Sequence, residues 1–121
     1  MRIITWNVCR AIKSSQVWNI LLNLQPDIAL LQEVGEIPES IKEIYQIKSE
    51  RPVTQKNNLQ KFLTVILIKG EIIENIHLFS KKDWINKKLD FFKGNFIGCV
   101  AKIEGYPQIN VICVYSPAWN I

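Results

Sequence analysis

Cysteine is scarce in this sequence, and the few cysteines present form no pattern typical of a cross-linked or metal-binding protein. Cys9, Cys99 and Cys113 are the only three, they lie far apart, and no C-x-x-C pair occurs. An odd number of scattered thiols excludes a disulfide scaffold and a cysteine-based zinc site, and it favours a reducing compartment. We therefore expect a cytoplasmic protein in which Cys99 and Cys113, which lie in apolar runs, are core residues.

Long hydrophobic runs are also absent. No apolar stretch approaches the roughly 18 residues of a membrane-spanning helix, and the N-terminus lacks the apolar core of a signal peptide. Hydrophobic residues nevertheless make up 48% of the 121 residues, which is enough to build a folded core. The composition therefore indicates one small domain over residues 1–121, without a membrane span.

Histidine occurs once, at position 77, inside a predicted strand and without an acidic partner nearby in the sequence. We interpret His77 as a partly exposed strand residue rather than a catalytic group. The net charge of +4 is compatible with a phosphate-bearing partner, but also with an ordinary surface. Residues 80–95 are rich in lysine and aromatic residues, which suits either contacts with a nucleic acid or a solvated loop. The lysines are Lys81, Lys82, Lys87, Lys88 and Lys93.

Alternating apolar segments predict an α/β fold with one mainly mixed β-sheet and helices on one face. Residues 14–25 carry apolar side chains at helical spacing, and Pro26 ends this segment. The expected strands lie at 2–6, 27–32, 62–70 and 71–79, a second helix at 38–47, a loop at 48–61 and a hairpin at 96–115. Several strands are apolar on both faces, so the sheet requires cover on both sides, whereas two helices cover only one.

Two polar residues stand where predicted strands end. Asn7 follows the strand at 2–6, and Glu33 follows the strand at 27–32. If these strands are parallel neighbours, both side chains emerge at the same edge of the sheet, where open α/β sheets form their sites. Mg²⁺ prefers oxygen ligands and is often held by one or two carboxylates together with water. Glu33 would offer a carboxylate at this edge and Asn7 a neutral amide, although an asparagine after a strand is more often a turn residue and a glutamate there is more often solvated.

Four motifs occur in a fixed order: "IITWNVCRA", "PDIALLQEV", "FLTVILIKG" and the hairpin "NFIGCVAKIEG…INVICVYSPA", which ends in Tyr-x-Pro. In this order they resemble the N-terminal half of the endonuclease/exonuclease/phosphatase superfamily, which includes exonuclease III-like and deoxyribonuclease I-like enzymes. The resemblance covers nearly all of the chain. It implies half of a two-sheet α/β sandwich and hydrolysis, dependent on Mg²⁺ or Mn²⁺, of a phosphodiester substrate such as a nucleic acid.

The same resemblance assigns roles to three residues. Glu33 matches the family's metal ligand, and Asn7 matches an amide that lies beside the metal and the substrate phosphate. Tyr115 matches a tyrosine near the scissile phosphate, where its hydroxyl is a hydrogen-bond donor. The substrate class stays open among DNA, RNA, inositol phosphates and lipid headgroups, because the family's specificity resides in divergent loops.

Two motifs of the family's second half are missing from this sequence. None of the three aspartates, Asp27, Asp83 and Asp90, lies in a Gly-Asp-x-Asn or a Ser-Asp-His segment. We therefore expect a truncated family member that is inactive alone. The alternative is a non-catalytic half-domain that acts by self-association or by assembly with a complementary chain. A sheet with helices on one side only leaves an apolar face exposed, which predicts a homodimer through that face.

Overall fold

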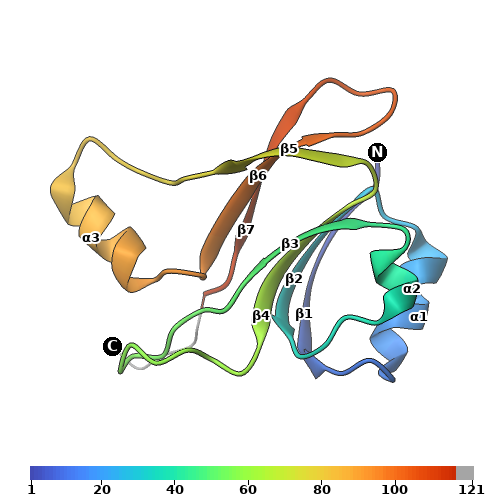
Figure 1. Cartoon of the computed structure of the whole chain (residues 1–121), viewed down its shortest axis with the longest axis horizontal. Helices are drawn as coiled ribbons and strands as arrows, with labels where there is room; N and C mark the ends of the chain where they lie inside the picture. The colour runs from blue at the N-terminus through green and yellow to red at the C-terminus, as the bar shows by residue number, and fades with distance from the viewer. Residues whose placement is uncertain (117–121) are drawn as a thin grey trace.

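The computed structural model describes residues 1–116, which form two β-sheets and three helices (Figure 1). The strands are β1 (Ile3–Ala11), β2 (Ile28–Val34), β3 (Gln46–Glu50), β4 (Leu63–Ile68), β5 (Glu71–Ile76), β6 (Phe96–Lys102) and β7 (Ile109–Val114). The helices are α1 (Gln16–Leu24), α2 (Glu39–Lys42) and α3 (Asp83–Phe91). The α/β fold class predicted from the sequence is confirmed.

The first sheet is mixed and has the strand order β1-β2-β4-β3. β1 and β2 are parallel, as the sequence predicted, while β4 runs antiparallel to both β2 and β3. The expected helix between β1 and β2 forms as α1, and its buried Trp18 and Leu21 pack on one face of this sheet. α2 covers the same face through Ile41, so both helices lie on the side away from β5–β7 (Figure 1).

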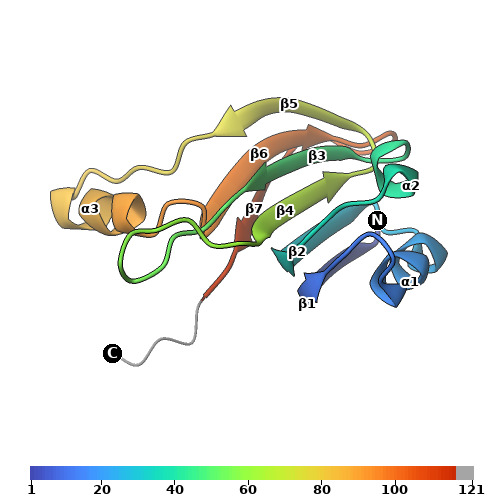
Figure 2. The ribbon, with the colours of Figure 1, turned by 60° about the horizontal axis from the view of Figure 1, so that its bottom comes forward.

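The second sheet is antiparallel, has the order β5-β6-β7 and packs on the opposite face of the first sheet (Figure 2). Ile66 and Ile68 of β4 lie in one buried cluster with Ile97 and Cys99 of β6 and with Cys113 of β7. The apolar residues on both faces of β4 therefore serve two cores, one against the helices and one against the second sheet.

Two sheets thus stand where the sequence predicted one, and the expected exposed inner face does not exist. The predicted pairing of 62–70 with 71–79 is wrong, because β2 and β3 already occupy both edges of β4. β5 consequently leaves the first sheet after Gly70 and pairs with β6 instead. The homodimer predicted through an uncovered inner face loses its basis, since the second sheet buries that face.

The segment between α2 and β4 also differs from its prediction. The helix expected at 38–47 is only Glu39–Lys42, and residues 46–50, divided between that helix and a loop in the prediction, form the edge strand β3. Tertiary contacts decide this outcome: β3 pairs with β4, and the buried Tyr45 donates a hydrogen bond to the carbonyl oxygen of Pro26 at 2.8 Å. Within residues 1–116, no helix has both the length and the apolar character needed to cross a membrane.

Candidate functional site

The carboxyl ends of β1 and β2 lie side by side, at the edge where the chain also leaves β7 (Figure 2). Asn7 of β1 is in register with Gln32 of β2, so Asn7 sits beside the residue that precedes Glu33. The sequence prediction that Asn7 and Glu33 emerge at one edge is therefore confirmed at the level of strand register.

Both strands become irregular at this edge. Cys9, Arg10 and Glu33 have left-handed backbones, with φ angles of 48°, 62° and 55°. A non-glycine residue in this region costs about 1–2 kcal/mol, and such strain persists where the surrounding structure holds it, often at functional sites. Here Gly35 helps to hold it, because its amide donates to the carbonyl oxygen of Ala11 at 2.9 Å, and a Cβ at Gly35 would stand only 2.8 Å from that oxygen.

Glu33 is half-buried, and its carboxylate reaches across the sandwich to the second sheet. The hydroxyl of Tyr115, the residue directly after β7, donates a hydrogen bond to Oε1 of Glu33 at 3.3 Å. Within residues 1–116 no lysine or arginine forms an ion pair with Glu33. The Tyr115 hydroxyl is therefore the side-chain hydrogen-bond partner that this carboxylate has in the described part of the chain.

Asn7 does not follow a strand that ends at residue 6, as the sequence predicted it would: β1 continues through it to Ala11, and the regular pairing with β2 breaks after Asn7. Its Oδ1 accepts a hydrogen bond from the backbone N–H of Cys9 at 3.0 Å, which closes an Asx-type turn and supports the left-handed residues that follow. This bond uses the amide oxygen of the exposed Asn7 and leaves its Nδ2 group as a donor. Asn7 thus presents a free donor group that can contact an anion, and its oxygen keeps one lone pair.

Tyr115 is packed by residues that the sequence analysis did not single out. The ring of Phe62 meets the Tyr115 ring edge-to-face, with 5.4 Å between centroids. The guanidinium of Arg10 in turn lies over the Phe62 ring, with its Cζ atom 5.5 Å from the ring centroid. Arg10 follows Asn7 by three residues, so its nearness to the predicted site was a usable signal, whereas the position of Phe62 depends on tertiary folding.

The pKa of Tyr115 is raised by burial first and then by the charge of Glu33 and their hydrogen bond, while Arg10 lowers it. The phenol therefore stays neutral well above neutral pH and acts as a hydrogen-bond donor rather than as a base. Tyr115 is fixed through its backbone as well: its N–H donates to the carbonyl oxygen of Asn95 at 2.7 Å, and Nδ2 of Asn95 donates to the carbonyl oxygen of Tyr115 at 3.0 Å. Pro117 of the Tyr-x-Pro motif lies outside the described residues.

The thiols beside this site are inert. Cys113 is buried, accepts a hydrogen bond from Nε2 of Gln32 at 3.5 Å, and has a pKa raised to about 11 by burial. Cys99 is buried as well, so both are core residues, as predicted, and all three cysteines are free thiols. Neither buried thiol is available as a nucleophile or a metal ligand at neutral pH.

The residues present suit a weakly held cation. The structure brings no three His, Cys, Asp or Glu side chains of residues 1–116 together as a metal-binding group. Glu33 offers one carboxylate that forms no ion pair within residues 1–116, and the Oδ1 atom of Asn7 already accepts one hydrogen bond from Cys9. A single carboxylate completed by water is within the range that Mg²⁺ accepts. Glu33 is therefore the one residue of the predicted trio that fits a ligand role, while Asn7 and Tyr115 are donors.

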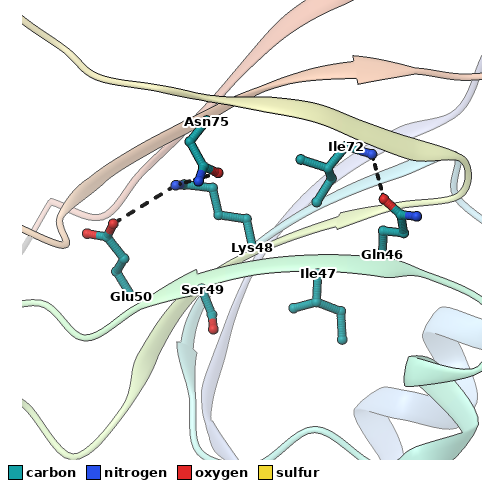
Figure 3. Close-up of a pocket in the computed structure, with 7 residues that line it drawn as sticks. All are labelled: Gln46, Ile47, Lys48, Ser49, Glu50, Ile72 and Asn75. Carbon is teal, nitrogen blue, oxygen red and sulfur yellow. Dashed lines mark hydrogen bonds and ion pairs between the residues drawn. The ribbon is translucent and has the colours of Figure 1, made fainter.

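A cavity of about 620 Å³ lies elsewhere, between the edge strands β3 and β5 (Figure 3). Its polar groups are satisfied by one another: Nζ of Lys48 donates to Oδ1 of Asn75 at 3.0 Å and pairs with Glu50 at 4.0 Å. The side chain of Gln46 likewise accepts the backbone N–H of Ile72 at 2.6 Å. These bridges tie the two sheets together, so we assign this cavity a structural role.

The basic segment at 80–95 and His77 lie away from the edge strand β1. The segment folds into α3, which buries no side chain and stands apart from the two sheets in both views (Figures 1 and 2). Trp84 on α3 is 64% exposed, as is suitable for stacking on a ligand. His77 is exposed and lines a second cavity of about 400 Å³ with Asp90 and Lys93.

Comparison of the chain with models of known protein families, with curated proteins and with solved structures finds no match.

Proposed function

We propose that this chain forms the cation-holding half of a Mg²⁺- or Mn²⁺-dependent phosphodiesterase of the endonuclease/exonuclease/phosphatase type. One observation carries the proposal: the Glu33 carboxylate and the Tyr115 hydroxyl, 82 residues apart, meet at the edge of the sandwich where β1 and β2 end. The resemblance noted in the sequence assigns these two residues to one site, and their contact supports that assignment. The left-handed backbone of Glu33 and of the facing Cys9 and Arg10 adds the strain that functional sites often contain.

In this proposal each residue has a separate task. Glu33 holds the cation, which would polarise a phosphoryl oxygen and offset the charge that develops during hydrolysis. The Nδ2 group of Asn7 donates a hydrogen bond to a phosphate oxygen, and Arg10 adds a positive charge at the same edge. The single hydroxyl proton of Tyr115, which Oε1 of Glu33 accepts in this structure, would turn to the phosphate when a cation takes that oxygen. Together they bind and orient a phosphodiester.

In this proposal the 121 residues do not include the group that activates the attacking water. Within residues 1–116 no three His, Cys, Asp or Glu side chains gather into a metal-binding group, and the sequence contains no Gly-Asp-x-Asn or Ser-Asp-His segment. We therefore propose that the chain binds cation and phosphate but does not turn over by itself. The alternative is a half-domain without catalysis, which works by assembling with itself or with a complementary chain.

We extend the proposal to the class of phosphodiester, for which a nucleic acid is the best candidate. A nucleic acid suits the exposed α3, whose lysines offer charge to a phosphate backbone and whose Trp84 offers a stacking surface. Three free thiols, one of them exposed, suit the reducing conditions of the cytoplasm.

Mn²⁺ binding tests the proposed role of Glu33. Electron paramagnetic resonance counts free aqueous Mn²⁺ directly, and we expect one weak site, with a dissociation constant on the order of 1 mM, because one carboxylate leaves most ligand positions to water. Glu33→Ala should weaken this site by at least about tenfold, which corresponds to about 1.4 kcal/mol.

The matched control is Glu43→Ala, which removes an exposed carboxylate without a side-chain hydrogen bond or ion pair in the described structure. Glu43→Ala should leave Mn²⁺ binding unchanged. Equal binding by the wild-type chain and by Glu33→Ala, or equal losses in both variants, would contradict the assignment of Glu33 as the cation ligand.

A further inference from the structure

β7 is an edge strand with an unusual composition. In the described part of the chain it pairs only with β6, so its other edge presents unpaired backbone N–H and C=O groups. Its six residues, Ile109–Val114, read INVICV and include no charged residue, proline or glycine. An uncharged edge of this kind is a template for pairing with another strand.

The other three sheet edges carry charged residues or an irregular end. β3 carries Lys48 and Glu50, and β5 carries Glu71 and Glu74. β1 carries Arg10 within an irregular end that departs from regular pairing. Charged side chains and irregularities of this kind discourage edge-to-edge association in soluble proteins. β7 is therefore the edge that is both uncharged and regularly paired along its whole length, whereas β1 is uncharged only up to Asn7 and irregular beyond it.

The outer face of the second sheet adds an apolar stripe beside this edge. Ile112 and Val114 of β7 are 43% and 48% exposed, and Phe96, the partner of Val114 on β6, is 37% exposed. Ile112 lies opposite Gly98, which has no side chain to cover it. The two helices α1 and α2 pack on the first sheet, and α3 buries no residue, so no helix of residues 1–116 covers this stripe.

We propose that β7 pairs antiparallel with β7 of a second copy of this chain, joining two three-stranded sheets into one sheet of six strands. A two-fold axis pairs a strand with itself in the antiparallel direction, so residues near the axis face their own equivalents and the two ends of the strand face each other. Self-pairing suits β7 because no like charges meet, whereas the same operation on β5 would bring its glutamates together.

The pairing would engage both the unpaired backbone groups of β7 and the exposed apolar side chains beside them. It provides about six backbone hydrogen bonds, since alternate residue pairs in an antiparallel ladder exchange two bonds each. It also places the exposed Ile112 and Val114 side chains of the two copies next to one another on one face. The inference does not depend on cation binding, because neither Glu33 nor a phosphate takes part in it.

Sedimentation velocity of the whole chain at micromolar concentrations tests this dimer. We expect the wild-type chain to dimerise, and Ile112→Lys to weaken the dimer by at least about tenfold, because it brings like charges into the new pair. Ile73→Lys is the matched control: Ile73 is 41% exposed on the same sheet but lies on β5, so the dimer should persist.

Amide hydrogen exchange tests the same β7–β7 pairing on the wild-type chain alone. The amides of β7 should exchange more slowly as the concentration of the wild-type chain rises, while the amides of the edge strand β3 should not change. A wild-type chain that stays monomeric would overturn the proposal, and would mean that another segment pairs with β7 or that none does. Open-ended aggregates, or a dimer without slower exchange in β7, would overturn it as well.

Discussion

Replacing Gly94 by alanine is expected to destabilise the fold by about 2–5 kcal/mol, which is a large part of the stability of a small domain. Gly94 is buried in the turn before β6 and has a φ of +82°, where an L-residue costs about 1–2 kcal/mol. A Cβ atom at this position would also overlap the carbonyl oxygen of Arg51, so backbone must move. Overpacking of this kind costs typically about 1–3 kcal/mol in addition.

Gly105 provides a control that separates the two causes. Its φ is +83°, almost the same as that of Gly94, but a Cβ atom there would meet nothing within 4 Å. Gly105→Ala should therefore cost only the conformational part, about 1–2 kcal/mol. Urea denaturation of both variants at one protein concentration measures the difference. Equal losses would show that the close approach of Gly94 to Arg51 does not exist in solution.

The Gly94→Ala variant also tests how Tyr115 is held in place, because Gly94 precedes Asn95 and lies against the backbone of Arg51. Asn95, the next residue, holds the backbone of Tyr115 by two hydrogen bonds. Arg51 begins the loop that leads to Phe62, whose ring packs against Tyr115. A shift of the turn at Gly94 is thus transmitted to the residue that contacts Glu33.

The second large effect is expected at the interface of the two sheets. Ile66→Ala should cost about 2–5 kcal/mol, the usual range for deleting most of a fully buried isoleucine side chain. Ile66 has no exposed surface and packs in the cluster shared by β4, β6 and β7. The loss combines the removed apolar contacts with the cavity that the rigid sheets cannot fill.

Ile73→Ala is the matched control for Ile66→Ala. Ile73 is 41% exposed on β5, so its truncation should cost less than about 1 kcal/mol. Unfolding in urea at a fixed protein concentration compares both variants. If Ile66→Ala were as mild as Ile73→Ala, the inner face of the first sheet would not be packed against the second sheet, and the arrangement described above would be wrong.

The local order of elements could be predicted from the sequence wherever one segment decides its own structure. The helical spacing of Val17, Leu21 and Leu24 and the stop at Pro26 predicted α1, which spans Gln16–Leu24. The order strand, helix, strand in about the first 30 residues suited a parallel pair, and the parallel register of β1 and β2 gives Asn7 and Glu33 the common edge expected if they were neighbours.

The sheet assignment could not be predicted, because it depends on competition between distant segments. β4 is apolar on both faces and could pair with either chain neighbour, and only the occupation of its edges by β2 and β3 sends β5 into another sheet. β3 itself has a weak local pattern, and pairing with β4 decides its structure.

The details of the site were hidden from the sequence for a related reason. The left-handed backbones of Cys9, Arg10 and Glu33 contradict the preferences of these residue types, so no propensity indicates them. The contact of Phe62 with Tyr115 joins residues far apart in the chain. The roles of Glu33, Asn7 and Tyr115 came from the resemblance of short motifs, and their task in catalysis stays a prediction.

The most direct test of the cation site is paramagnetic broadening by Mn²⁺ in the nuclear magnetic resonance spectrum of the ¹⁵N-labelled chain. Sub-stoichiometric Mn²⁺ should first remove the amide signals of Asn7, Gln32, Glu33 and Tyr115, which lie at one end of the sandwich. The signals of the β6–β7 turn around Gly105 should remain, and Glu33→Ala should restore those that were lost. Broadening centred on α3 or on the Lys48–Glu50 cavity, or an identical pattern in Glu33→Ala, would contradict the site at Glu33.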